Sequence, residues 1–192
     1  MKERTLLVIG AGGHGKAVAE AALLSGEWQA VTFADDRWPE LKESFGCPVI
    51  SNLAGLVDIA ATVDAAIAAV GNNGVREQWC ESIVAAGLQL ATVIHPRAFV
   101  SATATLGAGT AVMAMAMVGV DAVLGRGVIV NAGAIVDHDV SLDEFAHLGV
   151  GVQLAGGVKV EARAWLQAGC CAGYGVVVAE AAVVAPGTAL SS

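Results

Sequence analysis

His138 and Asp139 are neighbouring residues with the chemistry to move a proton. A histidine titrates near neutral pH, so its neutral ring can accept a proton, and an adjacent carboxylate can orient the ring and stabilise the imidazolium. The pair ends a polar cluster that starts at Asn131, inside a long apolar region. We predict that His138 is a general base assisted by Asp139. The alternative is a solvated surface histidine.

A glycine-rich turn near the N-terminus has the spacing that receives a phosphate. Residues 10–15 read Gly-Ala-Gly-Gly-His-Gly, after an apolar strand pattern and before a helical one. Such a turn directs backbone amides and a helix N-terminus at an anion, and an acidic residue further on can hold ribose hydroxyls. The candidate ligand contacts in this region are Gly12, Gly13, His14, Asp35 and Asp36.

Three interpretations of this turn remain open. An NAD-dependent dehydrogenase is disfavoured, because the segment before residue 95 is too short for a two-half dinucleotide fold. A single nucleotide or nucleotide-sugar fits the length better, and the glycines could also do no more than shape a turn.

A later loop, Gly71-Asn72-Asn73, follows another strand pattern. Because ligands of parallel sheets bind at the carboxyl ends of the strands, Gly71 and Asn72 are predicted to line the same crevice. The alternative is that the asparagines are only turn residues.

The first half of the chain alternates strand and helix patterns. Strands are expected at residues 6–9, 31–34 and 65–70, and helices at 14–24 and 75–86 with glycines after them. This alternation predicts a small parallel α/β sheet of the Rossmann-like type. We expect residues 1–90 to form this nucleotide-binding domain.

The second half repeats every six residues without interruption. From Ile94 to Leu190 every sixth residue is a small aliphatic, and a second register of small residues sits two positions ahead of each later member. A helix would repeat at about 3.6 residues and a half-buried strand at about 2, so the period predicts a coiled parallel β-solenoid over residues 91–192. In a three-sided coil of this kind His138 points outward, and His147 lies on another side of the prism.

Composition narrows the class of protein. Eighteen acidic and ten basic residues give a net charge of −8, which argues against nucleic-acid binding or a polybasic membrane patch. The uncharged stretch 98–120 continues the six-residue phase, so we do not expect it to enter a membrane. The N-terminus has no signal-peptide pattern, and no cysteine or histidine spacing is typical of a metal site. We expect a cytoplasmic protein that needs no metal.

At these residues the chain resembles the bacterial sugar O-acyltransferase family, which includes sialic acid O-acetyltransferases and the UDP-4-amino-sugar N-acetyltransferases of pilin-glycan and N-glycan biosynthesis. The resemblance covers nearly the full length. The segments that carry it are Gly10–Lys16, Asp35-Asp36, Val70–Asn73, Ile94–Pro96, Asn131 with Val136–Asp139, Phe145–His147 and Leu154–Val158.

The resemblance implies a left-handed β-helix, a homotrimer with active sites between subunits, and acetyl-CoA as co-substrate. It implies that His138 takes a proton from a sugar amine, that His147 and the backbone near Gly157 and Ala168 contact acetyl-CoA, and that the glycine turn and its aspartates hold the nucleotide-sugar. The second position of the base motif is often glutamate in the family and is Asp139 here. The expected activity is N-acetylation of a nucleotide-linked 4-amino-sugar. The alternatives are O-acetylation of a sialic-acid-like sugar and a non-catalytic nucleotide-sugar-binding protein.

Overall fold

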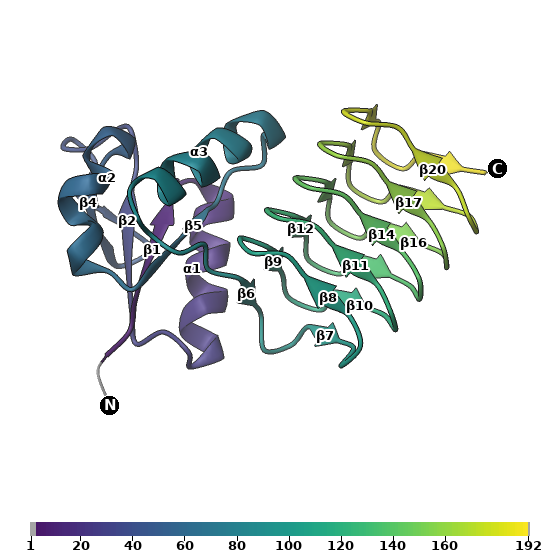
Figure 1. Cartoon of the computed structure of the whole chain (residues 1–192), viewed down its shortest axis with the longest axis horizontal. Coiled ribbons are helices and arrows are strands. Elements are labelled where there is room, and N and C mark those ends of the chain that lie inside the picture. Colours follow the sequence, from purple (N-terminus) through teal and green to yellow (C-terminus); the bar gives the residue numbers. More distant parts are fainter. Residues whose placement is uncertain (1–2, 192) are drawn as a thin grey trace. The chain divides into compact units, whose positions relative to one another are not determined.

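The computed structural model describes residues 3–191, and the chain separates into two compact units between Val93 and Ile94 (Figure 1). The first unit contains helices and a small sheet, and the second is a stack of short strands. In the described residues no helix is long and apolar enough to cross a bilayer.

A five-stranded sheet forms the centre of the first unit. Its order is β3-β4-β2-β1-β5, and every pairing is parallel except the β3–β4 hairpin. The strands are β1 (Thr5–Ile9), β2 (Ala30–Ala34), β3 (Glu43–Ser44), β4 (Cys47–Ser51) and β5 (Ala65–Ala68). The helices are α1 (Gly13–Ser25), α2 (Leu56–Ile59) and α3 (Asn73–Ala85), with short 3-10 turns at Leu53–Gly55 and Ala60–Thr62. The Rossmann-like prediction is confirmed, and β3 and β4 are additions to it.

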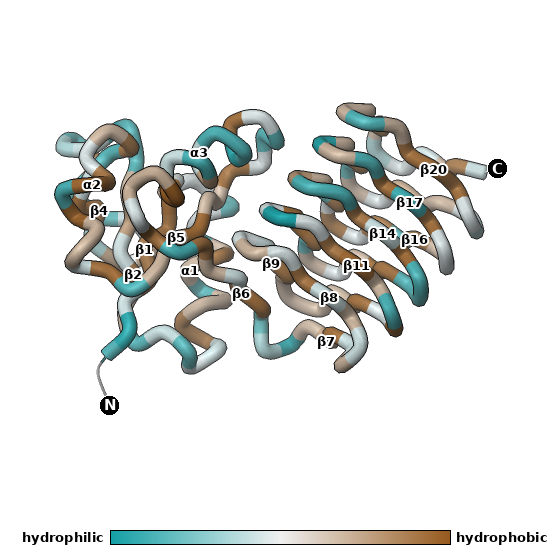
Figure 2. Tube along the Cα trace, in the orientation of Figure 1, coloured by the Kyte–Doolittle hydropathy of each residue, from teal (hydrophilic) through white to brown (hydrophobic). Residues whose placement is uncertain are grey.

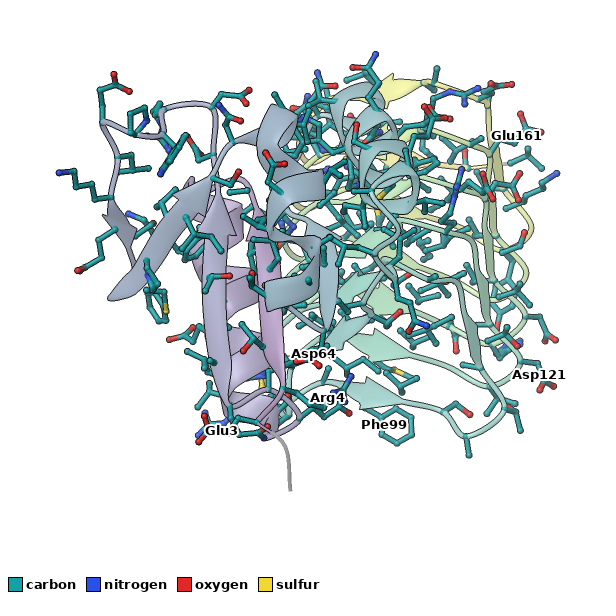
Figure 3. The ribbon with its side chains drawn as sticks, turned by 60° about the vertical axis from the view of Figure 1, so that its left-hand side comes forward. Glu3, Arg4, Asp64, Phe99, Asp121 and Glu161 are labelled. Atoms are coloured by element: carbon teal, nitrogen blue, oxygen red, sulfur yellow. The ribbon has the colours of Figure 1, made fainter. Side chains whose placement is uncertain are left out.

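Burial explains the central strands. Residues 6–9 of β1 and all four residues of β5 are buried, as expected for strands covered on both faces. At the start of β1 the backbone N–H of Thr5 donates to the Asp64 carboxylate at 2.8 Å, next to Arg4 in Figure 3. Helix α1 lies against the sheet through Gly15, where a Cβ would collide with the Gly10 carbonyl. This close approach requires glycine.

The second unit is a left-handed parallel β-helix, as predicted. Strands eighteen residues apart pair in register, for example Val118 with Val136 and Val136 with Leu154, and they build three sheets. The first sheet contains β7 (Phe99–Val100), β10 (Met117–Val118), β13 (Ile135–Val136), β16 (Gln153–Leu154), β19 (Cys171–Ala172) and β22 (Ala189–Leu190). The second contains β8 (Thr105–Leu106), β11 (Val123–Leu124), β14 (Ser141–Leu142), β17 (Lys159–Val160) and β20 (Val177–Val178). The third contains β6 (Val93–Ile94), β9 (Ala111–Val112), β12 (Ile129–Val130), β15 (His147–Leu148), β18 (Trp165–Leu166) and β21 (Val183–Val184).

Both inward registers of the six-residue repeat form one continuous core, from Val112 to Val178. Figure 2 shows the strands of the coils as brown segments between paler or teal turns. Ile94, the first member of the predicted series, is 38% exposed and lies outside this core. It belongs to β6, the end strand of its sheet, where pairing continues on one side only. At the same end of the stack, Phe99 on β7 is 60% exposed, and its ring stands outside the coil in Figure 3.

Candidate active site

A cleft of about 260 Å³ opens at the carboxyl ends of the strands in the first unit. The strand order reverses at β1, which pairs with β2 on one side and β5 on the other. The loops that follow β1 and β5 diverge there, and such a switch point is where parallel α/β sheets bind ligands. The residues lining the cleft are Gly10, Gly12, Gly13, His14, Asp35, Arg37, Ala69, Val70, Gly71 and Trp79.

The glycine turn leaves its backbone open to this cleft. A Cβ on Gly12 or Gly13 would meet nothing within 4 Å, so side chains do not screen these peptide groups. Gly12 is the N-cap of α1 and no side chain caps the helix. The first N–H groups of a helix have no intrahelical partner and carry partial positive charge, so this end of α1 is suited to an anionic group.

His14 presents a neutral ring to the same cleft. Burial, with a further contribution from the nearby Arg76 guanidinium, lowers the pKa of His14 to about 4. Its Nε2 is buried and finds no hydrogen-bond partner among the described residues. A buried polar atom without a partner costs free energy, which a bound ligand can recover. His14 is therefore placed to contact a ligand by hydrogen bonding rather than by charge.

Arg76 is a buried cation of α3 that contacts the loop after β5. It is 0% exposed, and its Nη1 donates to the carbonyl of Val70 at 3.1 Å and to that of Gly71 at 3.4 Å. Burial lowers the pKa of the guanidinium to about 10, so Arg76 stays charged at neutral pH. It fixes the loop after β5 that lines the cleft.

Asp35 already has partners for both carboxylate oxygens. Oδ2 accepts from the backbone N–H of Ala11 at 2.8 Å, and the Arg37 guanidinium binds both oxygens, with Nε at 2.7 Å from Oδ1 and Nη2 at 3.0 Å from Oδ2. Arg37 is the main cause that lowers the pKa of Asp35 to about 2. Asp35 thus ties the glycine turn to the end of β2. Its ribose contact stays a prediction, as does that of Asp36, which is exposed and does not line the cleft.

Asn72 has a structural function in the described chain. Its side-chain Oδ1 accepts from the backbone N–H of Val75 at 3.0 Å and caps α3. This is the turn interpretation that the sequence left open. Gly71, by contrast, lines the cleft as expected.

In the second unit His138 occupies the turn between β13 and β14, and Asp139 holds its ring. The Asp139 Oδ2 lies 2.7 Å from Nδ1 of His138. An ionised carboxylate only accepts hydrogen bonds, so Nδ1 carries the proton and Nε2 presents a lone pair. The hydrogen bond to Asp139 is the largest cause that raises the pKa of His138, and the charge of Asp137 adds to it. Nε2 is the atom through which this ring can act as a base.

The backbone of Asp139 explains why this short carboxylate reaches the ring. Its φ is +59°, in the left-handed region that aspartate tolerates better than most residues with side chains. Its N–H donates to the carbonyl of Val120 in the preceding coil at 2.9 Å. This turn fixes the carboxylate beside Nδ1 without the extra methylene of a glutamate.

Gly156 and Tyr174 occupy the same turn position as His138 in the next two coils of the β-helix. Gly156 follows His138 by one coil of eighteen residues, and Tyr174 follows by two. Tyr174 Oη lies 3.4 Å from His138 Nε2, and the two ring centroids are 6.0 Å apart. A Cβ on Gly156 would lie 2.6 Å from His138 Nε2 and 2.8 Å from Cε1 of Tyr174. The absence of a side chain at Gly156 lets the two rings meet.

The residues expected to contact acetyl-CoA occupy several parts of the β-helix. Gly157 adjoins His138, because its N–H donates to the His138 carbonyl at 3.0 Å. His147 lies on β15 in another sheet, where its ring stacks on Trp165 with centroids 5.6 Å apart. Ala168 is exposed in the turn between β18 and β19. Their roles as acetyl-CoA contacts stay predictions.

Comparison with known proteins agrees with this architecture. Residues 5–83 match the family model described as the PglD N-terminal domain. The acetyltransferase domain of PglB from Neisseria gonorrhoeae, solved in complex with acetyl coenzyme A, is 37% identical with a TM-score of 0.79, over 99% of this chain and 97% of that one. This chain belongs to the PglD-type family.

Two other relatives of this PglD-type chain are N-acetyltransferases by name, and one of them is solved with a nucleotide-sugar. A histidine-to-alanine mutant of GDP-perosamine N-acetyl transferase from Caulobacter crescentus, in complex with CoA and GDP-perosamine, is 32% identical with a TM-score of 0.86, over 97% of this chain and 90% of that one. The UDP-N-acetylbacillosamine N-acetyltransferase of Bacillus subtilis is 30% identical over 115 residues, and the match spans 51% of that protein's length.

Sequence reasoning gave no role to four residues of this PglD-type chain that its geometry brings forward: Arg37, Arg76, Gly156 and Tyr174. Of these, only Gly156 lies in a segment that carries the resemblance, Leu154–Val158. A signal existed for Gly156 and Tyr174, because both follow His138 at whole-coil spacings. Among the described residues, no three His, Cys, Asp or Glu side chains gather into a group that could hold a metal ion.

The pH dependence of this PglD-type chain should follow the Asp139 contact. A base acts in its neutral form, so the raised pKa of His138, the predicted base, is expected to make kcat/KM fall as pH decreases through a value above the ordinary pKa of histidine. Asp139→Asn removes the largest cause of that shift, and asparagine keeps the left-handed backbone. We expect the acid limb of the kcat/KM profile to move to lower pH, with a reduced plateau.

The control for this change is Asp121→Asn. Asp121 occupies the same turn position one coil earlier, with φ of +56°, and its substitution should leave the profile in place. An acid limb that stays at the same pH in Asp139→Asn would contradict the assignment of Asp139.

Proposed function

We propose that this protein is an acetyl-CoA-dependent N-acetyltransferase that acts on the amino group of a nucleotide-linked 4-amino-sugar. The observation that carries the proposal is the 2.7 Å contact between Nδ1 of His138 and the Asp139 carboxylate, which leaves Nε2 as the base atom on the coil edge. The activities and ligands of the PglB, perosamine and bacillosamine relatives support the same reaction.

The transfer proceeds directly within a ternary complex. The neutral amine nitrogen attacks the thioester carbonyl carbon and forms the C–N bond, while His138 Nε2 takes one N–H proton. The tetrahedral intermediate then collapses, the C–S bond breaks, and the leaving thiolate takes the proton held by the His138 imidazolium, which frees CoA and restores the neutral base. A neutral amine is already a good nucleophile, so positioning and one base supply most of what the reaction requires.

The cleft of the first unit suits the nucleotide end of the substrate. The open amides of Gly12 and Gly13 and the N-terminus of α1 favour a diphosphate. His14 is neutral and offers a hydrogen bond, and Gly71 also lines the cleft. We assign nucleotide-sugar binding to this unit, with Asp35, Asp36 and Asn72 around it, and the acyl transfer to the β-helix.

Acetyl-CoA is assigned to the β-helix, with His147 and the backbone at Gly157 and Ala168 as its contacts. We further propose a homotrimer with active sites between subunits. Large apolar side chains stay exposed on the sheet that contains β7 and β13, with Phe99 at 60% and Ile135 at 38%, and a partner subunit would cover them. The four free cysteines and the use of acetyl-CoA favour the cytoplasm.

The test is release of free thiol from acetyl-CoA with UDP-4-amino-4,6-dideoxy-N-acetylglucosamine as acceptor, and with GDP-perosamine in parallel. Turnover that requires the amine establishes the reaction. Binding of a nucleotide-sugar without thiol release would instead identify a non-catalytic binder, and transfer only to a hydroxyl would identify an O-acetyltransferase.

Arg37 is expected to contribute to acceptor binding. Its guanidinium is the one cation among the cleft-lining residues, since His14 is neutral, and its pairing with Asp35 uses Nε and Nη2 and leaves Nη1 for a phosphate oxygen. Charge-assisted hydrogen bonds to phosphate are worth about 1.5–3 kcal/mol, so Arg37→Gln should raise KM for the nucleotide-sugar roughly 10-fold or more. The KM for acetyl-CoA should not change in the same steady-state assay.

Lys16→Gln is the matched control for this charge removal. Lys16 is exposed on α1 and does not line the cleft. Equal effects of the two substitutions would show that Arg37 acts only through the net charge of the unit.

A further inference from the structure

We propose that Tyr174 orients the acceptor amine beside His138 and selects an amine over a hydroxyl acceptor. The inference rests on the proposed N-acetyl transfer. It extends that proposal by naming a second residue that contacts the reacting nitrogen, from a different coil of the β-helix than the base.

The fold brings Tyr174 to the base. The residue lies in the turn between β19 and β20, two coils beyond His138 on the same edge, and Gly156 in the intervening coil is buried between the two rings. The phenolic oxygen is 3.4 Å from Nε2, the base atom. The carboxylate of Asp137 is the other acceptor near this nitrogen, with Oδ2 at 4.0 Å.

The hydrogen-bonding capacity of an amine matches this pair of acceptors. A neutral primary amine has two N–H bonds and one lone pair. If one N–H is donated to Nε2 and the other to the phenolic oxygen, both N–H bonds are used in hydrogen bonds. The lone pair then stays free to attack the thioester carbon. After His138 has taken its proton, the amide product still has one N–H for Tyr174.

A hydroxyl acceptor does not fit as well. Its single O–H is donated to Nε2, and the phenol then meets the hydroxyl oxygen as a donor. That bond uses a lone pair of the nucleophile and lowers its reactivity. The same two side chains therefore favour nitrogen over oxygen at the reacting position.

Tyr174 has the freedom that this geometry demands. The two N–H bonds of a tetrahedral nitrogen diverge by more than a right angle, so the phenol must swing outward from its 3.4 Å contact to accept one of them. The side chain is 68% exposed and its neighbours Gly173 and Gly175 carry no side chains, so the ring has space to move.

The first test compares Tyr174→Phe with Tyr174→Ala in the thiol-release assay. One hydrogen bond is worth about 0.5–1.5 kcal/mol, so loss of the hydroxyl alone should lower kcat roughly 3- to 10-fold. The KM for acetyl-CoA and the melting temperature should stay unchanged. If the wild-type protein turns over and Tyr174→Phe has the same kcat, the phenolic hydroxyl is not needed and the inference is overturned. The proposed function would stand, because the acetyl transfer itself would still have been observed.

The second test needs no turnover. Tyr174 is the sole tyrosine of the chain, so 3-fluorotyrosine labelling gives one fluorine resonance that reports this residue. With CoA present, saturating 4-amino nucleotide-sugar should shift the resonance more than the analogue with a hydroxyl at the same carbon. Binding verified by calorimetry without a larger shift for the amine overturns the inference. Failure of the 4-amino nucleotide-sugar to bind overturns the proposed function and this inference with it.

Discussion

Replacing His138 by alanine is expected to lower kcat by about 10²- to 10⁴-fold, with little change in KM for either substrate. The ring is 46% exposed, and its polar contacts with Asp137, Asp139 and Tyr174 lie at the turn edge rather than in the core. Its loss therefore removes proton transfer and leaves binding and the fold in place. Residual turnover should remain, because positioning still brings amine and thioester together. Steady-state thiol release measures both parameters.

The pH dependence of turnover distinguishes two reasons for low activity in His138→Ala, the loss of the base and damage to the site. In the wild type the acid limb reflects titration of both His138 and the acceptor amine, so in His138→Ala the His138 component should disappear and only the component of the amine should remain. Val120→Ala is the matched control, since Val120 is exposed at the same turn position one coil earlier and its change should leave kcat unaltered. Full turnover in His138→Ala would remove His138 from the role of base.

The β-helix could be predicted almost completely from the sequence, because its core depends on a strict period. Each inward residue packs under the one eighteen positions later, so the pattern is local and uninterrupted. The prediction that Ile94 points into the core was wrong. Ile94 lies in the first coil, which no further coil covers, and the six-residue period carries no information about where the stack ends. The hand of the helix came from the resemblance.

The α/β unit was predicted less completely. Strands β3 and β4 were not expected, because a two-residue strand and a strand that begins Cys47-Pro48 give little apolar pattern. Helix α3 begins at Asn73 rather than Val75, since Asn72 supplies a cap that hydrophobic periodicity does not register.

Residue type and spacing identified His138 and Asp139 but not the contacts around them. The acidic position of Asp35 suggested a ribose ligand, whereas Arg37 two residues later and the Ala11 amide engage its oxygens. Arg76 gave no signal, because helical periodicity does not reveal a cation buried against loop carbonyls. Such contacts are set by tertiary structure.

Gly156→Ala is expected to lower kcat about 100-fold while the protein stays folded, because a misplacement of about 1 Å in a catalytic group costs on this order. The new Cβ would lie 2.5 Å from Cε1 of His138 and 2.8 Å from Cε1 of Tyr174. Both rings must move, and Nε2 leaves the position set by Asp139. Thiol-release kinetics and thermal unfolding measure the two effects.

The backbone itself should accept alanine at this position. The turns of other coils place Ala108, Ala132 and Ala162 two residues after their strands, as Gly156 is after β16. Ala162→Ser therefore serves as a control that adds one heavy atom at the same turn position on another edge, and it should leave kcat unchanged. Loss of activity in Gly156→Ala together with a large fall in melting temperature would point to a damaged coil. Unchanged kcat would show that the positions of the His138 and Tyr174 rings beside Gly156 do not matter for the reaction. It would contradict the proposal that both side chains contact the reacting amine.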